Sequence, residues 1–178
     1  DAPVITQGPG PLSLTVAEDS NLSYDLNATD VDAGTTLTWS LAGAASNGTA
    51  AIDSSTGVFT YSPNANFYGS DSATVNVSDS VLSVGMVIYL TVTPVNDAPV
   101  ITQGNGPLSY SLNEDSNFSF DLNATDLEGD VLTWSIASDP TNGTATVTAA
   151  TGTESYVPTA VFEGNDSLTL TVSDANLS

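Results

Sequence analysis

The chain has 178 residues and a formal net charge of −21, because it contains 21 Asp and Glu residues and no Lys, Arg or His. No side-chain salt bridge can therefore form. Nucleic acid and anionic membrane surfaces are not expected as partners, since both are bound through Lys and Arg.

Short β-strands are the elements that the sequence predicts. In the first half, apolar and polar residues alternate over short runs separated by Gly, Asn, Asp and Pro, and no helical spacing is present. This alternation predicts antiparallel strands near residues 12–16, 22–28, 37–41, 49–53, 58–62, 72–78 and 84–92. Such a series is typical of an immunoglobulin-like β-sandwich, with Trp39 as a core anchor on the third strand.

The second half of the chain repeats the first. Residues 1–30, DAPVITQGPGPLSLTVAEDSNLSYDLNATD, return as DAPVITQGNGPLSYSLNEDSNFSFDLNATD at residues 97–126, and LTWSL at 37–41 returns as LTWSI at 132–136. We therefore predict an all-β protein with two tandem sandwich domains, residues 1–96 and 97–178, and Trp134 in the role of Trp39. Pro94 and Pro99 predict a short, extended and stiff linker.

The second repeat lacks a counterpart of the last predicted strand. Its match to the first repeat ends at Ser178, opposite Ser83, so nothing corresponds to residues 84–92. We expect an unpaired sheet edge and an apolar groove there. Residues 1–6 have no signal-peptide character, so the sequence is either a mature chain or a piece of a longer one. The missing strand lies outside the sequence or is donated by another chain.

Most acidic residues recur at equivalent positions of the two repeats, and counting strand directions assigns them to domain poles. The bottom of repeat 1 receives Glu18, Asp19, Asp71, Asn96 and Asp97. The top of repeat 2 receives Asp126, Glu128 and Asp174, beside the same linker. We therefore expect the two sets to face each other. Several oxygen ligands, with no His or Cys, favour Ca²⁺ over Mg²⁺ or Zn²⁺; a solvated acidic surface is the alternative interpretation.

The outer pole of each repeat carries the equivalent acidic residues, but no second domain of this sequence faces them. They are Asp1, Asp30, Asp32 and Asp79 at the top of repeat 1, and Glu114, Asp115 and Asp166 at the bottom of repeat 2. Neighbouring repeats of a longer chain would complete these half-sites. If the chain is a whole subunit, head-to-tail copies would complete them instead, and a contact of this type that does not close generates a filament.

Several motifs resemble those of a known family. VNDAPVI at 95–101 resembles the cadherin linker, ATDVD at 28–32 and ATDLE at 124–128 resemble its Asp-x-Asp calcium motif, and AIDSSTGVFTY at 51–61 resembles its Ile-Asp-x-x-Thr-Gly strand pair. PNANFYGSDS at 63–72, followed by VSD, resembles the bacterial and archaeal cadherin-like tandem repeats of large calcium-binding surface adhesins and extracellular fibres. The resemblance implies interdomain calcium with ligand candidates Glu18, Asp71, Asn96, Asp97, Asp126, Glu128 and Asp174.

These observations predict an extracellular or cell-surface structural and adhesive protein whose domains are rigidified by Ca²⁺. It would act as a stalk or filament subunit, with itself or neighbouring repeats as partners, and could polymerise through calcium and strand donation. The alternative is a carbohydrate-binding module for surface polysaccharide, in which exposed Tyr68 or Tyr89 would stack on sugars. No enzyme is expected, because His, Cys and Lys are absent. No membrane insertion is expected either, because no apolar run is long enough.

Overall fold

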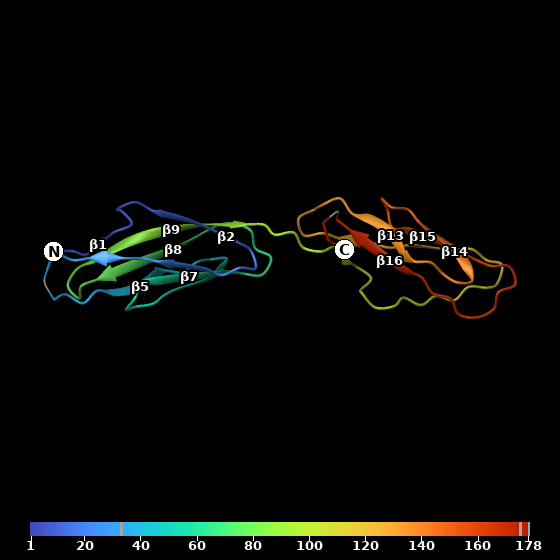
Figure 1. Cartoon of the computed structure of the whole chain (residues 1–178), viewed down its shortest axis with the longest axis horizontal. Coiled ribbons are helices and arrows are strands. Elements are labelled where there is room, and N and C mark those ends of the chain that lie inside the picture. Colours follow the sequence, from blue (N-terminus) through green and yellow to red (C-terminus); the bar gives the residue numbers. More distant parts are fainter. Residues whose placement is uncertain (33, 175, 178) are drawn as a thin grey trace. The chain divides into compact units, whose positions relative to one another are not determined.

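The computed structural model of the chain describes residues 1–32, 34–174 and 176–177. The chain divides into two compact units, Asp1–Val95 and Asn96–Ser178, one residue before the predicted boundary. They are called unit 1 and unit 2 below, and Figure 1 shows the strands of each. Within the described ranges, no helix has the length and hydropathy needed to cross a membrane.

Unit 1 is built from short strands at the predicted positions. Their bounds are β1 Val4–Ile5, β2 Leu12–Ala17, β3 Leu22–Asp25, β4 Ala28–Thr29, β5 Thr38–Gly43, β6 Gly48–Ile52, β7 Val58–Pro63, β8 Gly69–Ser78 and β9 Ser83–Thr93. Among the described residues they form one sheet in the order β2-β9-β8-β5, a second in the order β3-β7-β6, and the small pair β1-β4. The predicted β-sandwich class is confirmed.

One strand pair in unit 1 differs from the antiparallel expectation. β2 pairs with β9 in parallel register, with Leu14 opposite Leu90, whereas β8 pairs with β9 antiparallel. The first and last long strands run in the same direction, so they become parallel when they lie side by side. β9 is consequently an interior strand, next to β8 in Figure 1.

The core of unit 1 follows the alternation of β9. Met86, Ile88, Leu90 and Val92 are buried on this strand, while the residues between them are exposed. Phe59, Tyr61 and Trp39 pack into the same cluster from the β3-β7-β6 sheet and β5. Trp39 is 5% exposed, as expected for a core anchor.

Unit 2 repeats most of these strands. Their bounds are β10 Val100–Ile101, β11 Phe118–Asp121, β12 Ala124–Thr125, β13 Thr133–Ser138, β14 Gly143–Val147, β15 Thr153–Pro158 and β16 Thr169–Ser173. In the described part of unit 2, the sheets have the orders β11-β15-β14, β13-β16 and β10-β12. Trp134, 5% exposed, lies in the core like Trp39.

Unit 2 lacks counterparts of two strands within its described residues. Nothing corresponds to β9, and residues 107–113, which match β2 in sequence, form no strand (Figure 1). Among the described residues of unit 2, residues 107–113 pair with no strand. Leu112 is 38% exposed, whereas its equivalent Val16 is 7% exposed. The buried core of unit 2 is correspondingly small, with Leu122, Trp134 and Val172 in its central cluster.

The two cores also differ by one buried acidic residue. Position 154 is Glu in unit 2, whereas its equivalent in unit 1 is Phe59, which is 0% exposed. Glu154 is 8% exposed, and burial raises the pKa of its carboxyl. Ionised carboxylates are costly to bury without a partner. This side chain therefore lowers the stability of unit 2 at neutral pH.

A sharp turn in each unit depends on glycine. Asp53 accepts hydrogen bonds from the backbone N–H groups of Ser55 and Thr56, and Gly57 follows with a φ of +77°. A Cβ on Gly57 would lie 2.5 Å from the carbonyl oxygen of Leu26 and 2.7 Å from Nε1 of Trp39. Gly152 occupies the equivalent position beside Trp134.

We predict that Gly57→Ala destabilises unit 1 by roughly 1–3 kcal/mol, because an L side chain is strained at this φ and collides with the core tryptophan. Urea unfolding followed by tryptophan fluorescence measures the change. Gly10→Ala is the control, since nothing lies within 4 Å of its added Cβ. Equal effects of the two substitutions would contradict the prediction.

We predict that Glu154→Gln makes unit 2 more stable at pH 7, by about 1–2 kcal/mol, because it removes a buried charge. The raised pKa stabilises the folded state below the ordinary Glu pKa, and this contribution is lost as pH rises through the folded pKa. The gain should therefore shrink at pH 4. Urea midpoints at both pH values test this, with the exposed Glu163→Gln as control.

Candidate metal centres

The predicted top residues of unit 1 gather around one positive charge. The N-terminal ammonium of Asp1 forms an ion pair with the carboxylate of Asp32. Its pKa is raised, chiefly by this hydrogen bond, with further contributions from the negative charges of Asp32, Asp30 and Asp79. Asp30 and Asp32 follow β4, and Asp79 lies in the turn between β8 and β9. Asp1, Asp30, Asp32 and Asp79 are called the top pole of unit 1 below.

The geometry of this pole is fixed by the backbone. Asp30 Oδ1 accepts a hydrogen bond from the N–H of Asp32 at 2.7 Å. Asp79 Oδ1 accepts two, from the N–H groups of Val81 and Leu82, at 2.7 and 2.6 Å. These two bonds, that of Leu82 first, lower the pKa of Asp79. The carboxylate of Asp79 is therefore held ionised, and the side chains of Asp30 and Asp79 are held in set orientations.

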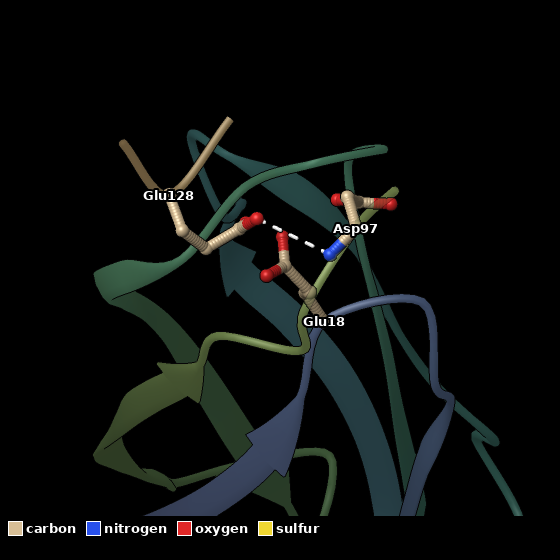
Figure 2. Close-up of side chains that lie close together, drawn as sticks. All are labelled: Glu18, Asp97 and Glu128. Atoms are coloured by element: carbon tan, nitrogen blue, oxygen red, sulfur yellow. Dashed lines mark hydrogen bonds between the residues drawn. The ribbon is translucent and has the colours of Figure 1, made fainter. Parts of the chain in front are cut away.

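The top pole of unit 2 brings together the predicted residues Asn96, Asp97, Asp126, Glu128 and Asp174. The side-chain amide of Asn96 donates to Asp174 Oδ2 at 2.6 Å. The backbone N–H of Asp97 donates to Glu128 Oε2 at 3.2 Å, the dashed line in Figure 2. Asp126 Oδ1 accepts from the N–H of Asp130 at 2.9 Å. The linker segment is thereby tied to the loop after β12 and to the end of β16.

Asp174 repeats the geometry of Asp79. Its Oδ1 accepts from the N–H groups of Asn176 and Leu177 at 2.7 and 2.6 Å. The N–H of Leu177, followed by the Asn96 amide, holds its pKa below the ordinary value. The side chain of Asn176 also donates to Asn96 Oδ1 at 3.2 Å. Sequence reasoning missed Asn176, and its place shortly after the repeated VSD motif is the signal that could have found it.

Both top poles contain buried carboxylate oxygens without a hydrogen-bond donor. These are Asp30 Oδ2 in unit 1, and Asp126 Oδ2 and Glu128 Oε1 in unit 2. A buried, unpaired anionic oxygen is unfavourable unless something positive binds it. No cationic side chain exists to balance these carboxylate oxygens, so a metal ion is a counter-charge that fits them. Carboxylate and amide oxygens are hard ligands of the type that Ca²⁺ takes.

Glu18 is a further buried carboxylate of unit 1, and it follows directly after β2 (Figure 2). Its backbone N–H donates to the carbonyl of Thr93 at 2.9 Å, and its Oε1 accepts from the N–H of Val95 at 2.8 Å. Oε2 is buried without a donor. Its equivalent Glu114 is exposed, because unit 2 has no described strand end to supply the matching amides.

In this structure, Asp71 and Asp166 accept several hydrogen bonds from nearby loop and tyrosine donors. Asp71 lies within β8, where it accepts hydrogen bonds from the N–H groups of Ser46 and Asn47 and from the hydroxyl of Tyr61, at 2.8–3.0 Å. Burial opposes ionisation of Asp71, but these donors and the N–H of Ser72 outweigh it, so its pKa is lowered. Asp166 accepts equivalent hydrogen bonds from the N–H groups of Thr141 and Asn142 and from the hydroxyl of Tyr156. Their predicted roles as metal ligands stay predictions.

We predict that Asp71→Asn destabilises unit 1 by about 1–3 kcal/mol at pH 7, because several charge-assisted hydrogen bonds weaken. Since the folded pKa is lowered, this stabilisation is present above the ordinary Asp pKa and is lost as pH falls through the folded value. Urea unfolding at pH 7 and pH 3 tests both statements. Asp25→Asn, a change at the exposed last residue of β3, is the control, and an equal loss in both variants would contradict the prediction.

Comparison with known protein families identifies the family of this fold. The family model described as bacterial cadherin-like domain matches residues 1–94. The chain belongs to the bacterial cadherin-like domain family. A model described as bacterial Ig domain matches residues 96–178. Domains of the cadherin-like family are typically extracellular and non-enzymatic, and tandem copies serve as adhesive or structural repeats.

Solved structures share the fold of this cadherin-like chain. Human protocadherin-24 EC1-2 matches with a TM-score of 0.60 and 19% identity, covering 96% of this chain and 85% of that one. Human CDH23 EC21-23 matches with a TM-score of 0.59 and 13% identity, covering 97% and 68%. At these identities the likeness concerns the fold alone.

The cadherin-like chain is shorter than several proteins that it resembles. It spans 32% of the protocadherin γB4 extracellular domain, at a TM-score of 0.51, 17% identity and 96% coverage of this chain. It spans 27% of an endo-fucoidan hydrolase of glycoside hydrolase family 107. No curated protein sequence matches the chain.

Proposed function

We propose that this chain is an extracellular structural and adhesive repeat whose domains are rigidified by Ca²⁺ bound at their poles. The observation that carries the proposal is the set of buried carboxylate oxygens without donors in a chain that has no cationic side chain, with Asp30 and Asp126 at equivalent positions. Family membership supports it, because cadherin-like repeats are known for calcium binding.

The proposed junction site uses residues from both units. Glu18, with Asp71 as a further candidate, would contribute from unit 1. The ligands from unit 2 would be Asn96, Asp97, Asp126, Glu128 and Asp174. Bound Ca²⁺ would supply the positive charge that these groups lack. The residues themselves would fix its position, since Asp174 and Asn96 are already oriented by the hydrogen bonds between them and to backbone amides.

The outer poles extend the proposal to assembly. Asp1, Asp30, Asp32 and Asp79 form the same type of half-site at the top of unit 1, and Glu114 and Asp166 belong to its lower counterpart in unit 2. A neighbouring repeat, or a second copy placed head to tail, would complete each half-site. Several junctions in series would make a stiff stalk or filament, because each bound ion replaces carboxylate repulsion by bridging contacts.

We predict that EDTA lowers the Tm and broadens the distribution of angles between the units. Extracellular calcium modules have dissociation constants of about 10⁻⁴–10⁻³ M. At a hundredfold excess over that constant, each site contributes about 2.7 kcal/mol, which corresponds to a Tm shift on the order of 10 °C. Scanning calorimetry and small-angle X-ray scattering with Ca²⁺ or EDTA test this, and an unchanged scattering profile would contradict it.

Paired variants locate the site. Asp126→Asn combined with Glu128→Gln should abolish most of the Tm difference between Ca²⁺ and EDTA. Asp121→Asn should leave that difference intact, because Asp121 is an exposed residue of β11. Calcium titration calorimetry of the three proteins separates loss of binding from loss of folding.

Carbohydrate binding is a second candidate function. Tyr68 and Tyr89 are 45% and 52% exposed, so their rings are accessible for stacking on sugars. A pull-down with insoluble polysaccharides, comparing the native chain with Tyr68→Ala and Tyr89→Ala, distinguishes this function from a purely structural one.

A further inference from the structure

One broad surface of unit 1 carries no charged side chain. It is the outer face of the β2-β9-β8-β5 sheet, formed by the strand residues that alternate with the buried core positions, and most of them are Ser or Thr. Asp71 is the one acidic residue within these four described strands. It shares the inward parity of Ala73 and Val75, and its carboxylate accepts a hydrogen bond from Tyr61 in the other sheet. This outer surface is called the neutral face below.

Tyr89 stands in the middle of the neutral face. It lies on the interior strand β9 and is directly opposite Ser13 of β2 and Ser72 of β8. Directly opposed residues have Cβ atoms about 4.5–5.5 Å apart, so the tyrosine ring has a small hydroxyl side chain on each side. Tyr89 is 52% exposed. The ring therefore projects above its neighbours and is not covered by them.

The next outward positions of β9 continue this pattern. Val87 is 37% exposed and is opposite Thr74 of β8. Thr91 is opposite Thr15 of β2. Alternate residues of a strand are about 7 Å apart, so Val87 and Tyr89 form a short apolar strip. Hydroxyl groups from both neighbouring strands border this strip.

Asn76 adds an amide group and keeps the neutral face low in relief. It is opposite Gly85 of β9, and a Cβ on Gly85 would lie 2.5 Å from Asn76 Oδ1. The amide side chain therefore lies across the glycine, along the surface of the sheet. A flat partner can consequently approach the apolar strip from this side without meeting a bulky side chain.

Electrostatics limits the kind of partner that this face can bind. The formal net charge is −21, so an anionic polymer and a second copy of the chain are both repelled. A cationic partner gains most where the carboxylates lie, and the neutral face offers none. Binding an uncharged partner here requires no desolvation of a charged side chain.

An uncharged polysaccharide has the groups that match the neutral face. Its hydroxyl groups donate and accept hydrogen bonds, as do the side chains of Ser, Thr and Asn. The C–H face of a sugar ring is an apolar surface that can stack on an exposed tyrosine. An extended chain of flat rings would contact the apolar strip and its hydroxyl border at the same time.

We propose that the neutral face binds an extended, uncharged polysaccharide, with one sugar ring stacked on Tyr89 and its hydroxyl groups bound by Ser13, Ser72 and Thr74. The inference rests on the carbohydrate-binding candidate function described above and deepens it. It assigns the site to Tyr89, not to Tyr68, and it states the chemical class of the polysaccharide. It does not depend on Ca²⁺.

Depletion binding to microcrystalline cellulose, chitin and mannan, all uncharged, tests the proposal on the full chain in EDTA. The native chain should bind at least one of them. Raising the salt concentration should leave this binding unchanged, because no ion pair is involved. Alginate, an anionic polysaccharide, should not be bound.

Variants of the two exposed tyrosines locate the stacking ring. Tyr89→Thr should weaken binding about tenfold, an effect typical of truncating an aromatic anchor. Tyr89→Phe should keep most of the binding because the ring remains, and Tyr68→Ala should have no effect. Threonine is favourable in strands, and tryptophan fluorescence verifies that each variant is folded.

A matched pair of charge variants tests the neutral face itself. Ser13→Asp places a carboxylate directly opposite Tyr89 and should abolish binding, because the new charge would have to be desolvated. Thr60→Asp places a carboxylate at an exposed position of β7, in the other sheet, and should leave binding intact. Both positions are exposed, so both variants should fold.

Four outcomes would overturn the proposal, and they separate it from the wider candidate function. Failure of the native chain to bind any of the three uncharged polysaccharides would reject both. Binding that survives Tyr89→Thr but is lost in Tyr68→Ala would reject only the placement on the neutral face. Preferential binding of alginate would reject the chemical class. Dimerisation in analytical ultracentrifugation that Tyr89→Thr abolishes would assign the face to an interface between copies.

Discussion

The absence of side-chain cations is the constraint on which the rest of this structure depends. Each carboxylate has to be solvated, bound by N–H and O–H donors, or matched by an ion from solution. Asp71, Asp79 and Asp174 take the second route, and donors lower their pKa values. Asp126 and Glu128 keep a buried oxygen with no donor. Some carboxylates thus have their oxygens bound by donors, whereas others keep one buried oxygen without a donor, and this second group is the basis for the proposed calcium sites.

Strand β9 has a comparable importance for the apolar part of the fold. It supplies four of the buried core residues of unit 1, Met86, Ile88, Leu90 and Val92, and it pairs with β2. Its end and the residues after it bind Glu18 through Thr93 and Val95. In the described part of unit 2, residues 107–113 form no strand, and Leu108, Leu112 and Glu114 are exposed. In unit 1, core packing and the orientation of a candidate ligand are therefore linked through one strand.

Much of this was predictable because it rests on local patterns. Alternation of apolar residues located nearly every long strand, and Trp39 and Trp134 are buried as their positions in the repeat predicted. Equivalent spacing also placed Asp30 with Asp32 and Asp126 with Glu128. The parallel pairing of β2 with β9 was not predictable in this way, since pairing of strands distant in sequence leaves no periodic signal. Asp71 is a similar case: its position suggested a pole, but its Oδ atoms bind Ser46, Asn47 and Tyr61.

The sequence by itself determined the β-sandwich class, the duplication, and the repeated slots that acidic residues occupy, because these depend on alternation and on spacing along the chain. Only the tertiary structure decided which carboxylate oxygens are already satisfied, that β9 is an interior strand, and that Glu154 takes the place of Phe59 in the core of unit 2. Those properties depend on which backbone N–H groups and side chains meet across the fold. A chain without cationic side chains cannot form side-chain salt bridges, and its folded structure shows which buried carboxylate oxygens lack a hydrogen-bond donor.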